Sequence, residues 1–248
     1  MKVFVSMSTI KREIDLISKT ETECLQTTQF YNKKIQVPQD FVIKDGKFVG
    51  DFEGLYKNFD DPWHQSRNDH LNDSRRSLTI NWCNRLREKY RATRVVELGC
   101  GFGHLSQALN KQNFSVVGTD ISKTAINKAR KVNSNSVFIE CALSDFDKLE
   151  LFDADIYIMA EITWYVLGDL DSFINNLKLT KKKRKDPIFL IHLLTTYSTG
   201  VQKYGTDKFT NLDEILKYFD LAYLESGFVR TPREDDLNSQ GTYFVAKI

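Results

Sequence analysis

Short apolar runs alternate with segments of helical periodicity from about residue 91 to residue 248. Apolar runs bounded by turn residues are typical of buried strands, and apolar positions three or four apart indicate helices. Strands that alternate with helices predict an α/β fold, with a doubly wound, mostly parallel sheet between two layers of helices. The predicted strands are 95–98, 115–118, 137–140, 155–160, 188–193, 221–224 and 242–248.

The predicted helices lie before and between these strands. In the helix that follows the first strand, Leu105, Ala108 and Leu109 share one face. Ser122 is placed to cap the next helix, because a serine hydroxyl can accept a hydrogen bond from a backbone N–H of the first turn. The predicted helices are 74–89, 104–111, 123–131, 170–179 and 212–219.

A glycine-rich turn follows the first strand. Residues 95–103 read Val-Val-Glu-Leu-Gly-Cys-Gly-Phe-Gly, and Asp120 lies at the tip of the second strand. Glycine is needed where the backbone turns sharply against a ligand, and an acid at this tip can accept hydrogen bonds from ribose hydroxyls. The dinucleotide pattern G-x-G-x-x-G would need its third glycine at His104, whereas here it is Gly103. The turn therefore predicts an adenosine-containing cofactor and disfavours a nicotinamide dinucleotide.

The spacing E-x-G-x-G-x-G, which begins at Glu97, resembles the first motif of class I S-adenosylmethionine-dependent methyltransferases. The resemblance covers the core from about residue 91 to the end and implies S-adenosylmethionine as the cofactor. It implies that Glu97 lies near the methionine amino group, that Asp120 binds the ribose, and that the last of seven strands is antiparallel. The cofactor-binding candidates are Glu97, Gly99, Cys100, Gly101, Gly103, His104, Asp120, Ile121, Ala142, Leu143 and Glu161.

The third strand departs from the family pattern. Many members carry an aspartate just past this strand that contacts the adenine amino group, whereas this chain has Ala142 near that position. Adenine could be held by backbone groups around Ala142 and Leu143, or by the side chain of Glu140 or Asp145.

Three residues are candidates for catalysis, because ligands of open α/β sheets bind beyond the carboxyl ends of the strands. Glu161 follows the strand 155–160 and could be a base, a substrate ligand or a cofactor neighbour; the alternative is an exposed strand-end carboxylate. His192 is predicted to end the strand 188–193, where a near-neutral pKa suits a base, although a lone histidine is often structural. His64 is a weaker candidate, and we expect His104 to cap a helix or contact the cofactor.

The first 90 residues differ in character from the core, and residues 51–65 are rich in aromatic and acidic side chains. Asp61-Pro62-Trp63 is similar to the D-P-W element of some small-molecule methyltransferases, including the nodulation-factor N-methyltransferases, in which this segment helps to form a lid. The alternative is a packing loop with a buried Trp63. We predict an amino-terminal extension and lid at 1–90 and a cofactor-binding core at 91–248.

Aromatic residues after the fourth strand suggest where an acceptor binds. Trp164 and Tyr165 could stack on a sugar, and the alternative is that they pack in the core. The predicted substrate-binding residues are Trp63, His64, Trp164, Tyr165 and His192.

The overall composition narrows the partners. The net charge is +2, with 41% hydrophobic and 27% charged residues, so we expect neither nucleic-acid nor membrane binding. No apolar run approaches the ~20 residues that span a bilayer. The basic run 181–185 is expected to be a solvated loop, partly acting on a helix C-terminus. The four cysteines lack metal-site spacing, which predicts no metal and a cytoplasmic protein with reduced thiols.

These observations predict a methyltransferase that uses S-adenosylmethionine and acts on a hydroxyl or amine of a small molecule. The acceptor could be a sugar, a sugar nucleotide or a surface-polysaccharide precursor. The alternatives are an RNA or protein methyltransferase of the same fold, or a non-catalytic nucleotide-binding protein.

Overall fold

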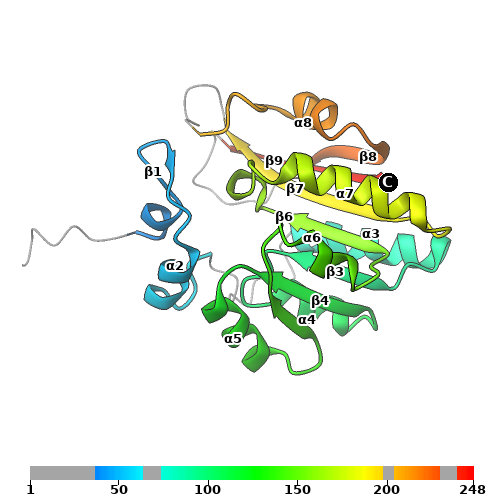
Figure 1. Cartoon of the computed structure of the whole chain (residues 1–248), viewed down its shortest axis with the longest axis horizontal. Helices are drawn as coiled ribbons and strands as arrows, with labels where there is room; N and C mark the ends of the chain where they lie inside the picture. Colours follow the sequence, from blue (N-terminus) through cyan, green and yellow to red (C-terminus); the bar gives the residue numbers. More distant parts are fainter. Residues whose placement is uncertain (1–36, 64–73, 198–203, 230–238) are drawn as a thin grey trace, which may run out of the picture. The chain divides into compact units, whose positions relative to one another are not determined.

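The computed structural model describes residues 37–63, 74–197, 204–229 and 239–248. Residues 38–248 belong to one compact unit. At its centre is a seven-stranded sheet, which Figure 1 shows between its helices. In spatial order the strands are β5 (Val137–Glu140), β4 (Ser115–Asp120), β3 (Arg94–Leu98), β6 (Ile156–Ala160), β7 (Phe189–Tyr197), β9 (Ser239–Lys247) and β8 (Ala222–Val229).

The five strands from β5 to β7 run parallel, whereas β9 is antiparallel to both β7 and β8. The middle strands are buried almost throughout, as expected of parallel strands that are covered on both faces. The predicted fold class and the antiparallel last strand are both confirmed.

Two helical layers bury the sheet. On one face, α3 (Ser74–Tyr90) and α4 (His104–Asn110) share a hydrophobic core with β3, β6 and β7. On the other face, α6 (Phe146–Glu150), α7 (Leu170–Lys183) and α8 (Leu212–Phe219) pack on the same strands and β9. None of the helices in the described ranges is long and apolar enough to cross a membrane.

Helix α5 (Lys123–Val132) packs beside β4 and β5, where Ile126 and Ala129 contact Phe138. Ser122 is its N-cap, and the serine side chain accepts a hydrogen bond from the N–H of Ala125, as predicted.

A short segment precedes the sheet. It comprises a 3₁₀ turn η1 (Pro38–Phe41), a small hairpin of β1 (Ile43–Lys44) and β2 (Lys47–Phe48), and helix α2 (Phe52–Asn58). Asp51 caps α2 by accepting a hydrogen bond of 2.8 Å from the N–H of Gly54.

The predicted end of the fifth strand is wrong. The prediction stopped this strand at residue 193, whereas β7 continues to Tyr197 because β9 supplies pairing partners along its whole length, from Phe189↔Lys247 to Tyr197↔Ser239. A strand can therefore extend beyond its apolar run wherever a neighbouring strand satisfies its backbone groups.

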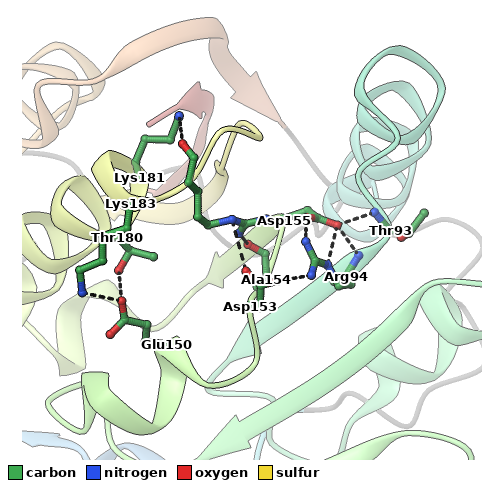
Figure 2. A network of polar contacts seen from close by, with 10 residues as sticks. Thr93, Arg94, Glu150, Asp153, Ala154, Asp155, Thr180, Lys181 and Lys183 are labelled. Atoms are coloured by element: carbon green, nitrogen blue, oxygen red, sulfur yellow. Dashed lines mark hydrogen bonds and ion pairs between the residues drawn. The ribbon is translucent and has the colours of Figure 1, made fainter.

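The basic run 181–185 also differs from its prediction. Its first three lysines form the last turn of α7, where positive charge is favoured by the helix dipole. Arg184, expected in solvent, has a side chain only 13% exposed and pairs with Asp155 at 3.0 Å and Asp153 at 3.3 Å. Figure 2 shows this network, in which Arg94 binds the same two aspartates.

Asp155 joins the start of two neighbouring strands. It accepts hydrogen bonds from the backbone N–H groups of Thr93 and Arg94, both at 3.0 Å. Burial works to raise the pKa of Asp155, but the hydrogen bonds from Arg94, Thr93 and Arg184 outweigh it and lower this pKa to about 2.

We expect Asp155→Asn to lower the free energy of unfolding by about 2–3 kcal/mol, because two arginines lose a buried anionic partner. Since the native pKa is depressed, this stabilisation is present above the ordinary pKa of 3.8 and is lost as the pH falls toward 2. Urea denaturation measures the loss. Lys183→Gln, which removes an exposed ion pair with Glu150, is the control and should cost less than about 1 kcal/mol.

Candidate functional site

The glycine turn links β3 to α4 at the carboxyl edge of the sheet. Its glycines have left-handed backbone conformations, with φ of 67° at Gly99, 53° at Gly101 and 73° at Gly103. A Cβ at Gly99 would lie 2.5 Å from the side chain of Ile162, and one at Gly103 would lie 2.5 Å from the ring of Phe138. Conformation and space therefore both require glycine at the first and third positions.

Two buried carboxylates flank this turn. Asp120, at the end of β4, accepts hydrogen bonds from the N–H of Gly101 at 3.0 Å and from the N–H of Ser122 at 2.9 Å. Glu97, in the neighbouring strand β3, accepts a hydrogen bond from the hydroxyl of Ser106. Each residue is only 6% exposed, so the acids belong to the interior of the site.

Burial sets the ionisation of both acids. It raises the pKa of Glu97 to about 7, although the bond from Ser106 and the charge of Arg76 act in the opposite direction. It also raises the pKa of Asp120 to about 6, despite the two backbone hydrogen bonds. Carboxyls with such raised pKa values are stabilised as carboxylates by a ligand that brings a cation or hydrogen-bond donors.

The other predicted cofactor residues lie around this pair. Ile121, directly after Asp120, exposes 57% of its surface, which is unusual for an isoleucine at the end of a buried strand. Cys100 is buried between α5 and β5, so only its backbone is available to a ligand. His104 is the first residue of α4, as expected, but the N-cap of this helix is Gly103 and not His104.

The predicted adenine-binding residues after β5 could contact a ligand through backbone groups more readily than through side chains. Leu143 is buried in the core, and Ala142 is half-buried beside it. Glu140 is exposed at the end of β5, and the half-buried Asp145 forms an ion pair with Lys148 at 3.0 Å.

Helix α2 docks onto α5 through a carboxylate that sequence reasoning missed. Glu53 accepts hydrogen bonds from the Ser122 hydroxyl (2.7 Å), the Thr124 N–H (3.1 Å) and the Thr124 hydroxyl (2.7 Å). Burial works to raise the pKa of Glu53, but these bonds outweigh it and lower the pKa to about 2. On the opposite side, Lys128 donates to the carbonyl oxygens of Tyr56 and Phe59 at 3.0 and 3.2 Å.

Aromatic rings extend this contact to the glycine turn and to the end of β6. The ring of Tyr56 lies 5.2 Å from that of Phe102, inside the turn. Tyr165, in the 3₁₀ turn η3 (Thr163–Tyr165) after β6, lies 5.3 Å from Phe52 and is stacked at 6.1 Å on Trp63. Two residues predicted to bind substrate, Trp63 and Tyr165, are thus brought together.

The side chain of Trp164 points into the core, away from Trp63 and Phe52. It is 7% exposed, donates from Nε1 to the carbonyl of Thr195 at 2.8 Å and packs on Phe209. The expectation that Trp164 stacks on a substrate is therefore wrong, because the 3₁₀ turn directs consecutive side chains to different sides and sends this one into the core.

Glu161 lies at the carboxyl end of β6 in a strained backbone conformation, with φ of 62°. Its Oε1 pairs with Arg75 at 2.9 Å, and its Oε2 accepts a hydrogen bond of 2.8 Å from the N–H of Thr195. A non-glycine residue held in the left-handed region at a strand end is typical of functional sites. Arg75 was not singled out from the sequence, because its partner lies 86 residues away.

His192 does not end its strand and does not reach the site. Its imidazole is fully buried, bonds from Nε2 to the Thr163 hydroxyl at 2.7 Å and stacks on Phe244. Burial lowers the pKa of His192 to about 3, so the ring stays neutral. These surroundings contradict a role for His192 as base or substrate ligand. The weaker candidate, His64, lies outside the described residues.

The strand order, the glycine turn and the two carboxylates at the edge of the sheet define the class I methyltransferase fold. Comparison with known proteins agrees: residues 89–194 match a family model described as a methyltransferase domain. A curated protein from Geobacillus sp. (strain WCH70), named "Putative methyltransferase", is 26% identical over 172 residues, which cover 62% of this chain and 69% of that protein.

Two solved structures share the fold. The N-methyltransferase NodS from Bradyrhizobium japonicum WM9, in complex with S-adenosyl-L-homocysteine, is 16% identical with a TM-score of 0.58, over 79% of this chain and 97% of NodS. The bifunctional kinase-methyltransferase WbdD is 18% identical with a TM-score of 0.53, over 73% of this chain but only 40% of WbdD. Residues 89–194 thus match a methyltransferase domain, and the sheet has the fold of class I S-adenosylmethionine-dependent methyltransferases, as the sequence predicted.

We expect Glu53→Gln to loosen α2, because a neutral amide replaces the ionised acceptor of three hydrogen bonds. Amide hydrogen exchange in residues 52–58 should quicken by about tenfold or more. Lys57→Gln, which removes only an exposed ion pair to Glu53, should leave this exchange nearly unchanged. Equal exchange in the Glu53 variant and the wild type would show that this carboxylate does not hold the helix.

Proposed function

We propose that this protein transfers the methyl group of S-adenosylmethionine to a hydroxyl or amine of a small molecule. The observation that carries the proposal is the pair of buried carboxylates, Glu97 and Asp120, on either side of a glycine turn that α2 covers. The sulfonium of the bound cofactor would supply the electrophilic methyl group, so the protein has to bind, orient and exclude water.

The residues around the turn fit this cofactor. Glu97 would bind the methionine ammonium, and Asp120 would accept hydrogen bonds from the ribose hydroxyls. The exposed side chain of Ile121 would lie against the adenine ring, with backbone groups at Ala142 and Leu143 along its edge. Backbone groups of the remaining turn residues would complete the site: Gly99, Cys100, Gly101, Gly103 and His104.

The acceptor would bind between the end of β6 and α2. Tyr165, Trp63 and Phe52 supply aromatic surface there, and Glu161 supplies a carboxylate that is 36% exposed despite its bonds to Arg75 and Thr195. Aromatic faces combined with a carboxylate suit a sugar ring, so a sugar, sugar nucleotide or polysaccharide precursor is our proposed acceptor.

We also propose that, within the amino-terminal extension predicted at 1–90, residues 38–58 act as a lid, whereas α3 packs in the core of the sheet. The docking of α2 on α5 and on the glycine turn supports this role, since it narrows access to the site. A small acceptor suits such a covered site better than a macromolecule.

An RNA acceptor finds no support in the basic run. Within it, Lys183 pairs with Glu150, Arg184 with Asp155, and Lys181 donates to the carbonyl of Arg184. These three contacts within the chain favour a structural role for the run over phosphate binding.

We propose a cytoplasmic location as well. The described cysteines Cys83, Cys100 and Cys141 are buried free thiols, which are typical of reducing compartments.

Methyl transfer itself tests the proposal. Purified protein would be incubated with S-adenosylmethionine labelled at its methyl group and with sugars, amino sugars and sugar nucleotides, while RNA and a protein mixture serve as rival acceptors. Label in a small molecule supports the proposal, and label in RNA or protein alone would overturn the small-molecule assignment.

Cofactor affinity should depend on pH, because Glu97 and Asp120 have pKa values of about 7 and about 6 in the free protein. A ligand that binds the carboxylate forms must displace protons below these values. We expect the Kd for S-adenosylhomocysteine to rise about ten- to twentyfold between pH 8 and pH 6. Calorimetry measures it. In Glu97→Gln the Kd should rise only about twofold over the same pH range, because only Asp120 still titrates. A Kd of the wild type that does not change with pH would contradict these roles of Glu97 and Asp120.

Glu161→Gln should lower methyl transfer at least about tenfold, because the neutral amide can neither remove a proton nor pair with Arg75. The affinity for S-adenosylhomocysteine should change by less than about twofold, since this carboxylate is proposed to contact the acceptor and not the cofactor. Glu88→Gln, at an exposed position on α3, is the control. Full turnover in the Glu161 variant would remove this residue from the catalytic machinery.

A further inference from the structure

Tyr56 carries a buried hydroxyl that the proposed roles above leave unused. The residue is on α2, is 4% exposed, and its ring packs against Phe102 of the glycine turn and Ala125 of α5. A polar group so deeply buried normally has hydrogen-bond partners for its proton and its lone pairs.

One hydrogen bond shows that the Tyr56 hydroxyl acts as an acceptor. Trp63 donates from Nε1 to the Tyr56 oxygen at 3.1 Å. An indole N–H only donates, so the tyrosine oxygen acts here as acceptor and its own proton is directed to another group. Among the residues that the structure describes, no hydrogen bond donated by this hydroxyl is found.

The surroundings of the hydroxyl indicate where that missing acceptor lies. The negative charge of Asp120 acts on Tyr56, and burial together with this charge raises the pKa of Tyr56 well above its usual range, so the proton is retained. Asp120 itself already accepts bonds from Gly101 and Ser122, one on each carboxylate oxygen. The hydroxyl therefore lies near Asp120, on a ring that packs against Phe102 of the glycine turn.

We propose that Tyr56 is a cofactor-binding residue, whose hydroxyl donates a hydrogen bond to an oxygen of S-adenosylmethionine next to Asp120. The inference rests on the proposed function and deepens it, because it makes α2 part of the cofactor site. The bonds of Glu53 to Ser122 and Thr124 then hold the tyrosine in place, so docking of α2 and binding of the cofactor stabilise each other.

The test compares two ligands by calorimetry on the full chain. S-adenosylhomocysteine carries both ribose hydroxyls and a carboxylate, whereas 5′-methylthioadenosine lacks the carboxylate. We expect Tyr56→Phe to weaken S-adenosylhomocysteine binding about three- to tenfold, the effect of one lost hydrogen bond. A similar loss for 5′-methylthioadenosine assigns the bond to the ribose, and a loss for S-adenosylhomocysteine alone assigns it to the carboxylate.

The control is Tyr90→Phe, which removes the hydroxyl from a ring that packs on Phe189 at the C-terminal end of α3. It should leave both affinities unchanged. Thermal unfolding without ligand separates binding from stability, since Tyr56→Phe should keep a midpoint close to that of the wild type. Equal affinities of wild type and Tyr56→Phe for S-adenosylhomocysteine would overturn this inference alone, whereas no binding by the wild type would overturn the proposed function.

Discussion

The site depends on one constraint: two carboxylates are buried at the edge of a parallel sheet, around a turn whose conformation and close packing require glycine at Gly99 and Gly103. Glu97 and Asp120 lie in adjacent strands, and the turn between β3 and α4 brings its own N–H group to Asp120. Burying acids is costly unless they are hydrogen-bonded or protonated. Their raised pKa values show that part of this cost persists in the free protein, and a ligand with an ammonium group and hydroxyl donors would relieve it.

The second organising contact joins the segment before the sheet to the sheet itself. A single carboxylate, that of Glu53, meets the N-terminal turn of α5, where the helix dipole and the hydroxyl groups of Ser122 and Thr124 favour negative charge. This contact sets Tyr56 and Trp63 over the turn and beside Tyr165. Helix α2 and the residues that follow it would therefore shape both the proposed cofactor side and the proposed acceptor side of the site.

Local patterns predicted the strands of the large sheet and five of its helices, but not α2, α6 or the β1–β2 hairpin, and long-range contacts escaped prediction. The glycine turn, the Ser122 cap and every strand of the sheet can be found from neighbouring residues, because turn and cap chemistry is local. The direction of the His192 side chain could not be predicted. Because β7 is covered on both faces, polar and apolar residues do not alternate along it, and the sequence does not show which face a side chain takes. Arg184 and Glu53 were missed for a related reason: their partners lie far away in the sequence, and only folding brings them together.

The central claim is that the glycine turn and its two acids form a working site for S-adenosylmethionine. Titration of the full chain with S-adenosylhomocysteine in a calorimeter, repeated with NADH, tests it most directly. The account predicts a saturable one-to-one isotherm for S-adenosylhomocysteine that is lost in Asp120→Ala, and no heat with NADH. Binding of NADH without binding of S-adenosylhomocysteine would contradict the account and assign the turn to a dinucleotide.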